Sequence, residues 1–122
     1  MIVVSLILNV VVLIPVAASL VWRAGWTIQS FGERTPARDI LLCVYLAILA
    51  ASVALLVAVA APHANWVNGA VVALLAVQVL YKITTAVAVR RSLRNPVVLS
   101  NLGIAIVHLI TLCVIVSGGA LR

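Results

Sequence analysis

The stretch "AVQVLYKITTAVAV", residues 76–89, is apolar enough to lie in a lipid bilayer, yet it contains Lys82. The 122-residue chain around it is 66% hydrophobic and only 8% charged, and its mean hydropathy is +1.36. A soluble domain is about one quarter charged. So few charged side chains cannot cover a soluble surface, and the sequence therefore predicts an all-α integral membrane protein forming one domain over residues 1–122.

Four apolar runs are each long enough, as a helix, to cross a hydrocarbon core about 30 Å thick. Thr35-Pro36 and Asn95-Pro96 are typical helix starts, with a capping side chain followed by proline at the first helical position. Asn68-Gly69 is typical of a turn. We expect four transmembrane helices in an antiparallel bundle with short connections, at about residues 2–22, 36–61, 69–89 and 96–118.

The arginines predict the orientation of these helices. The first and third connections each carry three arginines and the middle connection carries none, so the positive-inside rule puts the first and third on the cytoplasmic side and both termini on the outer side. Three tryptophans near the helix ends suit the membrane interface. The topology arginines are Arg23, Arg34, Arg38, Arg90, Arg91 and Arg94, and the interface anchors are Trp22, Trp26 and Trp66. The alanine- and arginine-rich composition favours a bacterial inner membrane.

Charge and cysteine content argue against several classes of function. Most of the arginines behind the formal charge of +6 stand at helix ends, where they meet lipid head groups, so we expect no nucleic-acid partner. Cys43 and Cys113 stand alone inside apolar runs, which predicts no metal site. Paired carboxylates, a nucleophile with its base and a phosphate-binding glycine loop are also missing from the sequence. We therefore expect neither an enzyme nor a bound cofactor.

Every predicted helix carries a polar residue in its interior. By helical rise, Lys82 lies roughly 11 Å from the cytoplasmic end of its helix, and Asn9, Ser52 and His108 lie roughly 18 to 20 Å deep. Polar residues of one helix also share a face, and polar atoms in hydrocarbon need partners. We predict a polar seam between the helices, formed by Lys82, Gln78, His108, Asn101, Asn9, Thr85, Thr111 and Ser52.

Lys82 has two interpretations at this stage. Its ammonium either reaches back to the cytoplasmic interface or stays buried and hydrogen-bonded. The only acidic residues, Glu33 and Asp39, lie at the cytoplasmic edge. A buried Lys82 is then neutral, or it takes its counter-ion from a bound anion, a lipid phosphate or an acid on another protein. His108 is either a hydrogen-bonded packing residue or a proton relay.

Small residues repeat along the second predicted helix at intervals of three and four residues. Such a row allows two helices to approach closely, either within the bundle or between copies of the chain. The row consists of Ala47, Ala50, Ala51, Ala54 and Ala58.

Three functions fit this pattern. The first is an accessory or assembly subunit of a larger membrane complex, whose other subunits supply the groups that this chain lacks. The second is a homo-oligomeric channel or transporter for an anion or small polar solute. The third is a phage holin-like pore former. All three have the lipid bilayer as a partner, together with other membrane subunits or copies of this chain.

Overall fold

The computed structural model describes residues 1–22, 25–61, 65–89 and 91–118. These residues form the helices α1 (Ile2–Val21), α2 (Gly25–Phe31), α3 (Pro36–Val59), α4 (Trp66–Ala88) and α5 (Pro96–Val116), and the 3-10 turn η1 (Ser92–Arg94). The four long helices are long and apolar enough to cross a membrane, so the described chain is all-helical and of multi-pass membrane type. Two of the predicted topology arginines, Arg23 and Arg90, lie outside the described residues.

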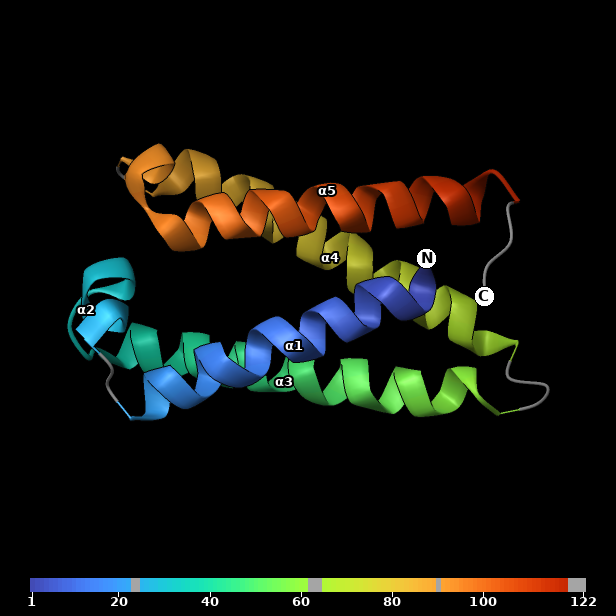
Figure 1. Ribbon diagram of the computed structural model, residues 1–122, viewed down its shortest axis with the longest axis horizontal. Helices are drawn as coiled ribbons and strands as arrows, with labels where there is room; N and C mark the ends of the chain where they lie inside the picture. Colours follow the sequence, from blue (N-terminus) through green and yellow to red (C-terminus); the bar gives the residue numbers. More distant parts are fainter. Residues whose placement is uncertain (23–24, 62–64, 90, 119–122) are drawn as a thin grey trace.

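The long helices lie along the long axis of the molecule, and each runs opposite to the one before it (Figure 1). α1 packs mainly on α3, and α4 packs mainly on α5, so the fold consists of two helix pairs. The two pairs meet where α4 crosses toward α3, near the start of α1, and they lie apart near α2 (Figure 1). We call these two regions the sealed end and the α2 end.

The sealed end is filled by aliphatic side chains. A buried cluster joins α1, α3 and α4, and Leu112 and Ile115 of α5 pack against it. Its members bury their apolar surface completely or nearly so, and they fill the space between the described helices at this end. The cluster consists of Ile2, Leu6, Leu55, Val67, Val71 and Leu75.

The α2 end contains an element that the sequence pattern did not predict. The connection after α1 includes the seven-residue helix α2, which ends at Phe31 and is followed directly by Gly32. Gly32 has φ +81°, and its N–H bonds to the Ile28 carbonyl at 2.9 Å, the usual left-handed termination of a helix. The chain then turns into α3, whose first turn is capped by Thr35 Oγ1 accepting from the Arg38 N–H at 3.2 Å.

The helix ends differ from the expected ranges mainly at α4. This helix begins at Trp66, ahead of the expected start at Gly69, so Asn68 and Gly69 lie in its first turn and form no separate turn. A helix satisfies its own backbone groups, which a turn at membrane depth does not, and this outweighs the turn preference of Asn-Gly. The other long helices end one or two residues before the expected positions, at Val21, Val59 and Val116.

Candidate functional site

The interior of the bundle contains a chain of hydrogen bonds between helices. Nearest the sealed end, the hydroxyls of Ser5 and Thr111 lie 2.8 Å apart and join α1 to α5. One turn further along α1, Asn9 donates through Nδ2 to Ser52 Oγ at 3.1 Å. Its Oδ1 lies 3.0 Å from His108 Nε2. An amide oxygen only accepts, so Nε2 of His108 carries the proton. Asn9 therefore links three helices.

Lys82 lies beyond this chain of bonds, toward the α2 end. Its Nζ donates to Asn101 Oδ1 on α5 at 3.0 Å and to the Tyr81 hydroxyl at 2.9 Å. It also lies 4.8 Å from the centroid of the Tyr81 ring, within the range of a cation–π contact. The side chain is only 3% exposed, so Lys82 is buried in the bundle and does not reach back to the interface.

The partners of the Lys82 ammonium are neutral. Of the two acidic residues, Asp39 is bound by Arg34 at 3.1 Å, at the surface. Within the described part of the chain, no ion pair joins Lys82 to a carboxylate. An ammonium has three N–H donors and the structure uses two, so one donor has no partner among the described residues.

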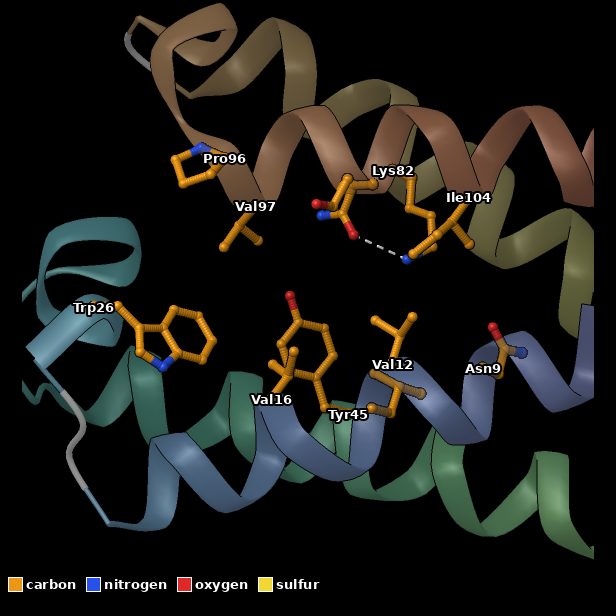
Figure 2. A pocket seen from close by; sticks show the side chains of 12 residues that line it. Asn9, Val12, Val16, Trp26, Tyr45, Lys82, Pro96, Val97 and Ile104 are labelled. Carbon is orange, nitrogen blue, oxygen red and sulfur yellow. Dashed lines mark hydrogen bonds between the residues drawn. The ribbon is translucent and has the colours of Figure 1, made fainter.

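A cavity of about 220 Å³ opens between the two helix pairs at this level. Figure 2 shows the Lys82 amine and the Tyr45 hydroxyl pointing into the space between the pairs, and the Trp26 indole beside it. Most of the remaining lining is apolar, with Val12 and Val16 from α1 and further aliphatic residues from α5. The cavity thus has a few polar groups in an otherwise apolar wall, the usual composition of a small-molecule site.

The α2 end of the cavity is held in place by three hydrogen bonds from two side chains to α2 and to the residue that follows it. The buried Arg38 guanidinium, 6% exposed, donates from Nη1 to the Gly32 carbonyl at 2.7 Å and from Nη2 to Thr27 Oγ1 at 2.9 Å. Asn95, which caps α5, donates from Nδ2 to the Ser30 carbonyl at 2.9 Å. α2 is therefore fixed to α3 and to the start of α5, and this positions Trp26 at the cavity.

Two residues of the expected polar seam lack an inter-helix hydrogen bond in the structure. Gln78 is 1% exposed, and both atoms of its amide lack a hydrogen-bond partner among the described residues. Thr85 donates to the Tyr81 carbonyl in its own helix at 2.6 Å. The inter-helix bonds that do form connect the other six residues, Lys82, Asn101, Asn9, Ser52, His108 and Thr111.

Most of the remaining predicted residues that the structure describes lie on the outside. Trp22, Trp26 and Trp66 are exposed, as are Arg34, Arg91 and Arg94, whereas Arg38 is buried. In the alanine row, Ala51 and Ala58 are half-buried, while Ala47, Ala50 and Ala54 face away from the rest of the chain.

Sequence reasoning missed several polar participants, among them Tyr45, Tyr81, Arg38 and Asn95. The two tyrosines could have been found, because each places a hydroxyl inside an apolar run, and such a hydroxyl needs a partner. Arg38 and Asn95 carried no such signal, because both stand at the ends of apolar runs, where polar residues are expected.

The candidate site therefore consists of the cavity with Lys82, Asn101 and Tyr45 at its polar wall. Groups of three or more potential metal ligands do not occur among the residues that the structure describes. Comparison with protein-family models, with curated proteins and with solved structures found no match to this chain.

Proposed function

We propose that this chain is an accessory or assembly subunit of a larger membrane complex. The observation that carries the proposal is the exposed part of the alanine row, Ala47, Ala50 and Ala54 on α3. In a bilayer, small residues on an outer face allow the backbone of another helix to come close, and such packing drives association between helices. The hydrogen bonds of the seam, in contrast, connect residues of one chain. These polar residues then stabilise the bundle, and its outer surface is left for a partner.

The proposed placement is an antiparallel bundle in the inner membrane of a bacterium, with the α2 end on the cytoplasmic side and both termini outside. Its support is the position of the exposed arginines. Arg34 follows α2. Arg91 directly precedes η1 and Arg94 is its last residue, and η1 lies at the same end of the molecule (Figure 1). Cytoplasmic connections carry the excess of positive charge.

This orientation predicts the result of cysteine labelling in intact cells. In a background with Cys43 and Cys113 replaced by alanine, Ala61→Cys at the sealed end should react with a membrane-impermeant maleimide. Glu33→Cys at the α2 end should react only after the cells are opened. Both positions are exposed, so a difference in labelling would reflect the side of the membrane and not burial within the protein. Labelling of Glu33→Cys from outside would reverse the proposed topology.

A homo-oligomeric channel or transporter is the second candidate, and the cavity beside Lys82 is the observation that favours it. A conducting path would have to continue through the sealed end, where the aliphatic cluster fills the interior of a single chain. The path would then run between copies, which could pack through the same exposed alanines. The two candidates thus differ in what packs on the exposed face of α3. A subunit would have a different polypeptide there, and a channel would have another copy of this chain.

Purification in mild detergent tests the two candidates. The tagged chain, expressed at native level in its own host, should elute with a second polypeptide at fixed stoichiometry, measured by mass determination. Ala50→Leu, which adds bulk to the exposed row, should release that polypeptide. The matched control Ala76→Leu makes the same change at an exposed position of α4 and should retain it. A complex containing only this chain would favour the channel, and a monomer would contradict both proposals.

A further inference from the structure

We propose that the cavity beside Lys82 binds a long-chain carboxylate, with the carboxylate on the Lys82 ammonium and the chain leaving between α1 and α5 into the bilayer. This inference does not depend on the proposed subunit role. It rests on the charge, the donors, the size and the opening of the cavity.

A protonated Lys82 requires compensation for its charge. A buried ammonium loses its hydration, and neutral hydrogen-bond partners replace only part of it. Asn101 and Tyr81 are such partners, and the chain's own Asp39 is held by Arg34 at the surface. An anion in the cavity would accept a hydrogen bond from the third N–H of the ammonium. Such a charge-assisted bond is about twice as strong as a neutral one.

The geometry offers a second donor for the same anion. The Tyr45 hydroxyl points into the space between the helix pairs that the Lys82 amine also faces (Figure 2). Tyr45 belongs to α3, which pairs with α1, and Lys82 belongs to α4, which pairs with α5. Both side chains line the cavity. A carboxylate has two oxygens and accepts from both groups at once, so it would connect the two pairs where the bundle leaves them apart.

The size of the cavity limits the ligand. Its volume of about 220 Å³ exceeds the roughly 150 Å³ of an apolar cavity that admits benzene. It is smaller than the roughly 300 to 1,000 Å³ of a pocket that encloses a drug-sized molecule. The cavity therefore holds a head group and the first part of a chain, and the rest of a longer ligand must lie outside.

The opening lies between α1 and α5. These helices pack mainly on α3 and α4 and lie apart at the α2 end (Figure 1). Val12 and Val16 line one side of the cavity, and Val97 and Ile104 line the other (Figure 2). Ser100, which also lines it, is exposed. An alkyl chain that passes between these aliphatic residues would reach the lipid without crossing a polar surface.

The cavity is suited to a carboxylate better than to a phosphate. A phosphate monoester carries a charge of about −1.5 to −2 and has three acceptor oxygens, and proteins usually meet it with arginine or several donors. Among the described residues that line the cavity, Lys82 is the one cation and none is an arginine. One negative charge with two acceptor atoms matches this set of donors.

The experiment uses tryptophan quenching in phosphatidylcholine nanodiscs. Trp22→Phe and Trp66→Phe leave Trp26, which lines the cavity, as the only tryptophan. Doxyl-labelled stearate should quench Trp26 saturably, and its neutral methyl ester should quench it much more weakly. Lys82→Met should weaken stearate binding by about 10- to 100-fold, the loss expected for one charged hydrogen bond. Arg94→Met removes a charge outside the cavity and should leave binding unchanged.

A second variant keeps the test decisive if Lys82→Met fails to fold. Val12→Phe retains the ammonium but fills the cavity, and it should also abolish saturable quenching. Unlabelled oleate should compete, and lysophosphatidate should compete less well. Equal quenching by the methyl ester, unchanged binding in either cavity variant, or stronger competition by lysophosphatidate would each overturn the assignment of a carboxylate site.

Discussion

Replacing Arg38 with methionine should release α2 from the bundle. The buried guanidinium donates to the carbonyl of Gly32, directly after α2, and to the Thr27 hydroxyl within α2, and methionine offers neither bond. Hydrogen bonds to charged groups contribute about 1.5 to 3 kcal/mol each. We expect the local opening free energy of α2 to fall by about 2 to 4 kcal/mol, so that its amides exchange more than tenfold faster. Hydrogen exchange of residues 25–31 in nanodiscs, read by mass spectrometry, measures this change.

Arg34→Met is the matched control for this variant. It removes the same side chain four residues earlier, where the guanidinium is exposed and forms a surface ion pair with Asp39. Exposed pairs contribute about 0 to 1 kcal/mol, so exchange in α2 should be nearly unchanged. If the two variants accelerated exchange equally, the bonds of Arg38 would not be what holds α2.

Replacing Asn9 with leucine should destabilise the whole bundle. Asn9 is bonded to Ser52 on α3 and to His108 on α5, so its loss breaks both links and leaves the His108 imidazole buried without a partner among the described residues. Interhelical hydrogen bonds in membranes average about 0.6 kcal/mol and reach about 1.7. An unsatisfied buried group adds about 1 to 3 kcal/mol. We expect a loss of about 2 to 4 kcal/mol in unfolding free energy, measured by reversible titration with SDS in mixed micelles.

Gln78→Leu tests the same argument in the opposite direction. It also exchanges a buried amide for leucine, but the Gln78 amide has no partner among the described residues. Removing an unsatisfied polar group should leave the stability unchanged or raise it by about 1 to 3 kcal/mol. Equal destabilisation by both substitutions would show that the measurement reports side-chain volume and not hydrogen bonding.

Much of the fold follows from local sequence. Apolar runs of membrane length specify the long helices, because a chain in hydrocarbon must satisfy its own backbone groups. Thr35-Pro36 and Asn95-Pro96 fix two helix starts by local capping bonds. The same rule explains the error at α4, where Asn68-Gly69 indicates a turn by composition but is helical in the structure.

The sequence predicted part of the candidate site, Lys82 and Asn101, but not how these residues pair. Helical spacing put Gln78 and Lys82 on one face of α4, and both are buried, yet only Lys82 has a hydrogen-bond partner among the described residues. Helical spacing shows which residues share a face of one helix, but it does not show which residue of a neighbouring helix lies opposite them. That depends on how α5 is rotated and how far it is shifted along α4, which the packing of all the helices decides together.

The sequence by itself determined that the chain contains four membrane-length helices, which faces of them are polar, and that its acidic residues lie away from Lys82. These are properties of composition and of helical periodicity. Only the tertiary structure decided that Arg38 is buried while Arg34 is exposed, that the short helix α2 is bonded to α3 and to the start of α5, and that the two helix pairs diverge to leave a cavity at Lys82. Burial and hydrogen bonding between distant residues depend on how whole helices are placed relative to one another. Residues that are close in the sequence do not specify that placement.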